Sequence, residues 1–107
     1  MDFKKLIIDT LSINSKFKNR LGKQGRMLDL VEEVGELANA MLMVDGNKTS
    51  GDPAKQRTKE DISDAIADIL YDLIILSDHY DVDLDVEYTE MLTRMKQRFE
   101  NSDLIGK

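Results

Sequence analysis

The chain has 107 residues, of which 41% are hydrophobic and 34% charged, and its formal net charge is −6. This composition excludes a disordered chain, and the negative charge argues against binding of duplex nucleic acid, which requires a basic surface. The absence of cysteine excludes disulfides and thiolate metal sites. No apolar run approaches the roughly 18 residues of a membrane span. We therefore expect a single cytoplasmic domain over residues 1–107 with no membrane contact.

The spacing of apolar residues predicts two helices in the first half of the chain, at about residues 2–21 and 26–44. In the first, apolar residues recur every three or four positions as far as Leu11, and the looser pattern that follows indicates a helix end or a kink. Gly46 is expected to cap the end of the second helix. Eight apolar residues form one stripe along that second helix: Met27, Leu30, Val31, Val34, Leu37, Ala38, Met41 and Leu42.

Residues 45–57 form a polar connection that contains the only proline of the chain. Its length is unusual inside a compact domain, which makes it a candidate functional loop. Lys48, Lys55 and Arg57 could reach phosphate groups from this loop, but a simple solvated loop is the preferred interpretation of these cations.

Two further helices are predicted after this loop. Thr58 and Asp61 have the spacing of a capping box, and the helix that they begin is expected to end at about Tyr80. After a turn at residues 81–85, a fourth helix is expected to end near residue 101, followed by a frayed tail. No sustained alternation of period two predicts a strand, so the expected fold is all-α and four-helix-bundle-like.

The second predicted helix concentrates three carboxylates within the stretch VEEVGELA of residues 31–38. Glu32, Glu33 and Glu36 project from one side, since residues three and four apart are neighbours on a helix. At about 100° per residue, Glu33 also falls at the edge of the apolar stripe. These carboxylates are therefore expected at the rim of the core, not on the fully solvated back of the helix.

The third predicted helix repeats this pattern with four aspartates spaced by three, four and four residues: Asp61, Asp64, Asp68 and Asp72. Like charges at such spacings cost an isolated helix about 0.2–0.5 kcal/mol per pair. If the two helices pack together, the acidic strips converge and require a cation, for which Mg²⁺ is suited because it prefers oxygen ligands. A solvated acidic surface is the alternative, although residues 31–44 lack any Lys or Arg to balance the charge.

The chain resembles the MazG-like, all-α nucleoside triphosphate pyrophosphohydrolases over about residues 27–99. The carboxylates of residues 32–36 resemble the EExxE motif of these enzymes. Residues 68–78 and the Val-Asp-Leu sequence at 82–84 resemble their third helix and the turn after it. The Arg-Phe sequence at 98–99 resembles the pair that closes their fourth helix.

The resemblance implies hydrolysis of a nucleoside triphosphate to the monophosphate and pyrophosphate, as nucleotide-pool housekeeping, with Mg²⁺ or Mn²⁺ as cofactor. It also implies a homodimer or homotetramer whose active sites are completed near subunit interfaces. Carried over by position, Glu32, Glu33, Glu36 and Asp68 would bind the metal or orient the attacking water. Either Glu32 or Glu33 would act as general base.

The sequence departs from the family pattern at two places. The family's ExxD pair calls for a glutamate where this chain has Ala65, so Asp64 is expected to replace it as a metal ligand, with Asp61 in reserve. In the fourth helix, methionines occupy positions where many relatives carry a substrate-binding Lys and Asn. Three basic residues could contact phosphate instead, or form a solvated basic face: Arg94, Lys96 and Arg98.

Two alternatives to this function stay open. Residues 67–71 also resemble the third helix of the phosphoribosyl-ATP pyrophosphatases of histidine synthesis, but the turn at 82–84 and the Arg-Phe ending favour the MazG-like pattern. A non-catalytic helical interaction module with the same fold is the second alternative, and its main support is Ala65.

Overall fold

The computed structural model describes residues 2–18 and 20–101, and this part of the chain contains four α-helices and no strand. The all-α, four-helix prediction is thereby confirmed. The predicted frayed tail lies outside the described residues from residue 102 onward. None of the described helices is long and apolar enough to cross a membrane. The helices are α1 (Phe3–Ser15), α2 (Lys23–Val44), α3 (Lys59–His79) and α4 (Leu84–Glu100), with a short 3₁₀ turn, η1 (Pro53–Lys55), between α2 and α3.

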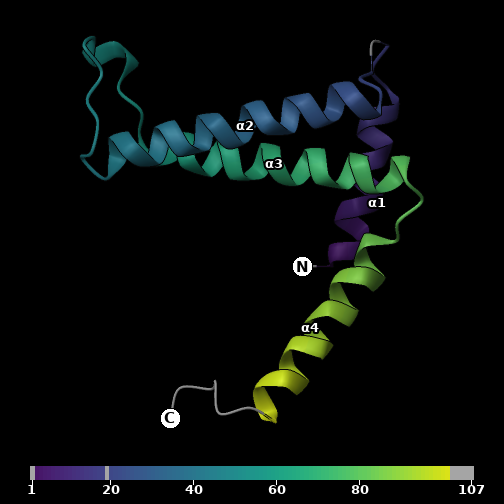
Figure 1. Ribbon diagram of the computed structural model, residues 1–107. Coiled ribbons are helices and arrows are strands. Elements are labelled where there is room, and N and C mark those ends of the chain that lie inside the picture. Colours follow the sequence, from purple (N-terminus) through teal and green to yellow (C-terminus); the bar gives the residue numbers. More distant parts are fainter. Residues whose placement is uncertain (1, 19, 102–107) are drawn as a thin grey trace.

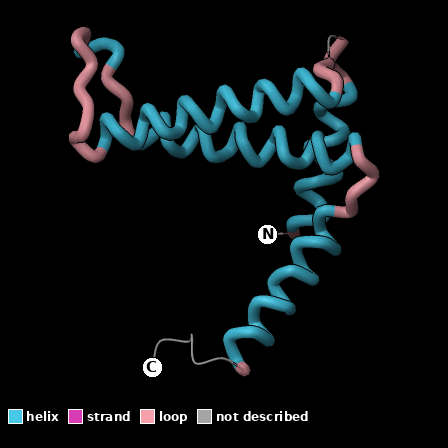
Figure 2. The backbone as a smooth tube through the Cα atoms, in the orientation of Figure 1, coloured by secondary structure: helices cyan, strands magenta, loops and turns pink. Residues whose placement is uncertain are grey.

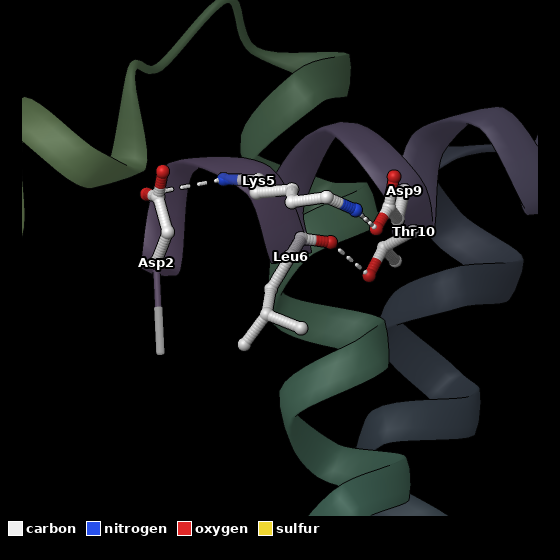
Figure 3. A network of polar contacts seen from close by, with 5 residues as sticks. All are labelled: Asp2, Lys5, Leu6, Asp9 and Thr10. Carbon is white, nitrogen blue, oxygen red and sulfur yellow. Dashed lines mark hydrogen bonds and ion pairs between the residues drawn. The ribbon is translucent and has the colours of Figure 1, made fainter.

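Helix α1 is held at its start by contacts within its own first turns. Asp2 caps it by accepting a hydrogen bond from the backbone N–H of Lys5, whose Nζ in turn lies 2.7 Å from a carboxylate oxygen of Asp9 (Figure 3). The hydroxyl of Thr10 donates to the carbonyl of Leu6. Such exposed pairs contribute only about 0.2–0.5 kcal/mol each, so α1 must depend on packing as well.

Capping explains where the other helices begin. Helix α2 starts at Lys23, three residues before the predicted position, after the extended backbone of Gly22. The predicted capping box of α3 is confirmed, with the backbone N–H of Thr58 donating to Asp61 Oδ2 at 2.7 Å. Helix α4 starts inside the predicted turn because the side chain of Asp83 caps it, as the N-cap position favours.

The helices do not close around one core within this chain. Helices α2 and α3 lie side by side as an antiparallel hairpin, α1 packs across the end of α3, and α4 leads away (Figures 1 and 2). The radius of gyration is 17.7 Å, against about 13 Å for a compact domain of this length. Only four apolar residues of the described chain are buried: Ala40, Ala65, Ile74 and Ile75.

The interface between α2 and α3 contains charged residues. Arg26, Glu33 and Ala40 are seven residues apart on α2, and Ala65 and Asp72 are seven apart on α3, so each set lies on one helical face. All of these are buried except Glu33, which is half-buried. The hairpin therefore combines small apolar residues with polar ones along its contact.

Arg26 and Asp72 form an ion pair inside this interface. The distance from Arg26 Nη1 to Asp72 Oδ1 is 2.8 Å, and the side chains are only 10% and 1% exposed. The other guanidinium nitrogen, Nη2, approaches Asn14 Oδ1, which also accepts a hydrogen bond from the Tyr71 hydroxyl. Three helices thus meet at one polar cluster. Asp72 is buried here, contrary to its predicted place in the acidic strip of α3.

Breaking this ion pair should be strongly destabilising. We expect Asp72→Ala to lower the free energy of unfolding by about 3–5 kcal/mol, because it leaves a buried guanidinium unpaired. The double variant Arg26→Met/Asp72→Leu should recover most of that loss, since it removes both charges and keeps the volume. Urea unfolding at one fixed protein concentration measures both changes. A loss below about 1 kcal/mol in the single variant would show that the pair is not a structural lock.

Candidate functional site

Acidic residues of α2 and α3 gather around one small pocket, called here the acidic pocket, with a volume of about 190 Å³. Five of its seven lining residues are carboxylates, and all five were predicted as site residues. Convergence of the two acidic strips is the arrangement that their helical spacing predicted. The lining residues are Glu33, Glu36, Arg57, Asp61, Asp64, Ala65 and Asp68.

The register of the hairpin explains why the pocket forms at Glu33. Arg26 of α2 pairs with Asp72 of α3, and the two helices are antiparallel. Glu33 is seven residues after Arg26, and Ala65 is seven residues before Asp72, so Glu33 and Ala65 lie opposite each other. Both residues line the acidic pocket. The methyl group of Ala65 is too short to fill the space opposite Glu33, and this leaves room for a ligand.

Glu33 is the electrostatically least satisfied residue of the pocket. Its Oε2 atom is buried and has no hydrogen-bond partner within the described chain. Burial raises the pKa of Glu33 above its ordinary range, and the negative charges of Glu36 and Asp68 raise it further, followed by Asp29 and Asp72. A carboxylate in this environment is stabilised by a proton or by a cation.

The donors of the pocket fit a hard divalent cation. Carboxylate oxygens are the ligands that Mg²⁺ prefers, and Mg²⁺ often keeps several waters while using only one or two carboxylates together with substrate phosphates. As the described side chains are placed, no three Asp, Glu, His or Cys residues form a ready-made metal site. The fit therefore rests on donor chemistry and on the unpartnered Glu33 oxygen, not on a preformed coordination shell.

Comparison with known proteins gives one match. Residues 1–95 match the family model described as phosphoribosyl-ATP pyrophosphohydrolase. The chain belongs to the phosphoribosyl-ATP pyrophosphohydrolase family. No curated protein and no solved structure matches the chain.

Membership of the phosphoribosyl-ATP pyrophosphohydrolase family revises the functional prediction. This family is part of the MazG-like all-α superfamily, so the broader resemblance is confirmed. The family match does not support the preference for enzymes that act on free nucleotides. It supports the alternative, a phosphoribosyl-ATP pyrophosphatase, whose third helix residues 67–71 resemble. The turn at 82–84 and the Arg-Phe ending are therefore weak discriminators between the two groups of enzymes.

Two predicted acidic residues have a position that limits their predicted role. Glu32 is exposed and does not line the acidic pocket, so its role as ligand or base stays a prediction. Asp61 lines the pocket, but its Oδ2 already accepts the capping hydrogen bond from Thr58 at 2.7 Å. Asp64 and Asp68 both line the pocket, and neither forms an ion pair with another described residue.

The basic residues predicted on α4 are far from the acidic pocket of their own chain. Arg94, Lys96 and Arg98 are exposed on the arm that leads away from the hairpin (Figure 1). Asp68 lies about 16 Å before the end of α3, and Arg94 lies about 15 Å beyond the start of α4, at 1.5 Å per residue. Phosphate contacts from α4 would therefore have to be made to the site of another subunit.

Arg57 is the site residue whose importance was underestimated. The sequence favours a simple solvated loop position for Arg57, yet the residue lines the acidic pocket, where its Nη1 lies 3.7 Å from Asp61 Oδ1. The available signal was its position one residue before the Thr58 cap, which places it at the start of the acidic helix.

Glu33→Gln should stabilise the metal-free protein at neutral and alkaline pH. The folded state binds the Glu33 proton more tightly than the unfolded chain does, so wild-type stability should fall as pH rises from the ordinary Glu range through the raised pKa. The variant should lack this fall. Its gain at pH 8 comes first from removing a buried charge and then from relief of like-charge repulsion, of which the two pairs within α2, with Glu36 and Asp29, contribute about 0.4–1 kcal/mol. Thermal unfolding from pH 4 to pH 8 measures this, and equal slopes for both proteins would contradict it.

Proposed function

We propose that this protein hydrolyses phosphoribosyl-ATP to phosphoribosyl-AMP and pyrophosphate in the presence of Mg²⁺. The family match over residues 1–95 supports the substrate. The observation that carries the chemistry is the buried Oε2 atom of Glu33, which has no hydrogen-bond partner among the described residues and lies in a pocket with four other carboxylates. A polyphosphate does not bind such a surface unless a cation intervenes, which is why the proposal includes the metal.

In the proposed reaction, a water oxygen bonds to the α-phosphorus, the bond from that phosphorus to the bridging oxygen breaks, and pyrophosphate leaves. Glu33 is the best-placed general base, because a raised pKa strengthens a carboxylate as a proton acceptor and its buried Oε2 has no competing partner among the described residues. Glu36, Asp64 and Asp68 would hold Mg²⁺, which when bound supplies positive charge to the phosphates and activates water. Arg57 adds a fixed positive charge at the same pocket.

A free nucleoside triphosphate is the second candidate substrate. The turn at residues 82–84 and the Arg-Phe sequence at 98–99 favour it, since both resemble enzymes that act on free nucleotides. The two candidates share the bond that is broken and the pocket that breaks it. ATP differs from phosphoribosyl-ATP only in lacking the phosphoribosyl group on the adenine ring, and the other nucleoside triphosphates differ also in the base, so substrate comparison separates the candidates directly.

The assay uses purified protein, Mg²⁺, phosphoribosyl-ATP and each common nucleoside triphosphate, with pyrophosphate and orthophosphate measured separately. We expect pyrophosphate release, with the highest kcat/KM on phosphoribosyl-ATP. Glu36→Gln and Asp68→Asn should each reduce kcat/KM by at least about 100-fold, or about 2.7 kcal/mol, because each removes a proposed metal ligand.

The matched control is Glu87→Gln, which makes the same change of charge on an exposed residue of α4. It should leave kcat/KM within about twofold, as surface substitutions usually do. Release of orthophosphate would refute the proposed cleavage site, and faster turnover of free nucleotides would favour the second candidate. Absence of turnover on every substrate would favour a non-catalytic module.

We further propose that the protein works as a homodimer or homotetramer. The apolar stripe of α2 includes exposed Val31 and Val34, and α3 carries one that includes exposed Ile66, Leu70 and Leu73. On each helix, the stripe is rotated around the helix axis away from the α2–α3 contact, and the direction of this rotation, viewed along the chain, is the same for both helices. Because the helices are antiparallel, both stripes lie on one face of the hairpin, and a second hairpin packed there would complete a four-helix core.

An aspartate on this face should dissociate the oligomer. We expect wild-type protein to sediment as a dimer or tetramer at micromolar concentration, and Ile66→Asp to sediment as a monomer, because a charge cannot be buried there without a partner. The control is Lys59→Asp on the same helix, an exposed residue outside the stripe. Sedimentation equilibrium measures the mass. A monomeric wild-type protein would contradict the proposal.

A further inference from the structure

A second cavity lies beside the acidic pocket, beneath the loop that joins α2 to α3. It is called here the loop cavity, and its volume of about 530 Å³ is typical of sites for small molecules. The two cavities adjoin, because Arg57 and Asp61 line both of them. The loop cavity is lined by Asn39, Met43, Ser50, Ala54, Lys55, Gln56, Arg57 and Asp61.

The charge of the lining changes between the two cavities. The acidic pocket has five carboxylates and one cation, Arg57. The loop cavity has two cations, Lys55 and Arg57, and one carboxylate, Asp61, which is already engaged in capping α3. The first cavity therefore favours a cation and the second an anion, and the change occurs at Arg57.

The loop that forms this cavity is held by its own hydrogen bonds. The backbone N–H of Ser50 donates to Gln56 Oε1 at 3.1 Å, which ties the two sides of the loop together. The backbone N–H of Arg57 donates to the sulfur of Met43 on α2 at 3.3 Å. A loop backbone that is already held in place lowers the entropy cost of binding a ligand, because the loop does not have to be ordered first.

The Arg57 guanidinium keeps most of its hydrogen-bonding capacity. Its nearest carboxylate oxygen, on Asp61, is 3.7 Å away, which is beyond hydrogen-bond distance, and the two side chains are 42% and 36% exposed. A guanidinium has five N–H donors in a planar fork that matches two oxygens of a phosphate. Asn39 adds amide donors to the same cavity, since its oxygen is occupied by Lys48.

We propose that the loop cavity binds phosphate, and that Arg57, assisted by Lys55, holds the two terminal phosphates of the substrate, which leave as pyrophosphate. This inference rests on the proposed function for its substrate. With the α-phosphorus at the acidic pocket, the chain of phosphates extends past Arg57 into the adjoining cavity. The other phosphate of phosphoribosyl-ATP, on its ribose, carries less charge and is the second possible source of the bound group.

The test measures binding of inorganic pyrophosphate and of ribose 5-phosphate, each with Mg²⁺, by isothermal titration calorimetry. We expect wild-type protein to bind pyrophosphate, Arg57→Gln to bind it at least 10-fold more weakly, and Arg57→Lys to lie between, because lysine keeps the charge and loses the fork. Lys59→Gln removes one positive charge two residues away, outside both cavities, and should bind like wild type. Binding of ribose 5-phosphate should be equal in all four proteins.

Kinetics separate this inference from the proposed function. Arg57→Gln should raise the constant for product inhibition by pyrophosphate in parallel with its loss of binding. Weaker ribose 5-phosphate binding in this variant, with pyrophosphate unchanged, would overturn the assignment to the leaving group. Equal pyrophosphate binding in wild type and Arg57→Gln, or none in either at millimolar concentration, would overturn the phosphate site itself. If pyrophosphate binding depends on Arg57 but no substrate is hydrolysed, the phosphate site stands, and the proposed function fails together with the assignment to a leaving group.

Discussion

The ion pair between Arg26 and Asp72 is the interaction on which the rest of this structure depends. It fixes how far α2 is displaced along α3, and that register sets Glu33 opposite Ala65 one heptad away. A shift by one helical turn would bring a different residue opposite Glu33 and fill the pocket. Purely apolar contacts would tolerate such a shift more readily, because they are not directional. Burial raises the pKa of Asp72 and the guanidinium of Arg26 opposes that effect, so each charge needs the other.

The cost of placing charges in this contact must be offset elsewhere. Few apolar residues are buried within one chain, while large apolar side chains stay exposed along both helices of the hairpin. A structure this open has little hydrophobic stabilisation of its own, and small domains with this deficit usually gain the remainder by association. If a second copy covers the exposed face, folding, assembly and completion of the acidic pocket become linked. The resemblance to enzymes whose sites lie near subunit interfaces points in the same direction.

Local physics made most of the fold predictable from the sequence. Apolar spacing located four helices, and the Thr58–Asp61 capping box located the start of α3 to the residue. The carboxylates of the acidic pocket were predictable because helical period decides which of them share a side. The pairing of Asp72 with Arg26 was not predictable from the sequence. The two residues are distant in sequence, and they meet only because of the register between α2 and α3, which is a tertiary property. The role of Arg57 was missed for the same reason, since only the folded loop places it between two cavities.

The two adjoining cavities favour ligands of opposite charge. The acidic pocket is dominated by carboxylates, which favour a cation, and the loop cavity offers donors to an anion, so a complex of Mg²⁺ with a polyphosphate would complement both while neither ion alone would. Metal bound among the carboxylates would remove the repulsion that a phosphate otherwise meets there, and phosphate held by Arg57 would add oxygen ligands for the metal. Each ligand then raises the affinity for the other, which is a coupling free energy in the ordinary thermodynamic sense. The Glu33 carboxylate strengthens the cation half of this coupling, because burial and the neighbouring negative charges that raise its pKa also favour a bound cation beside it.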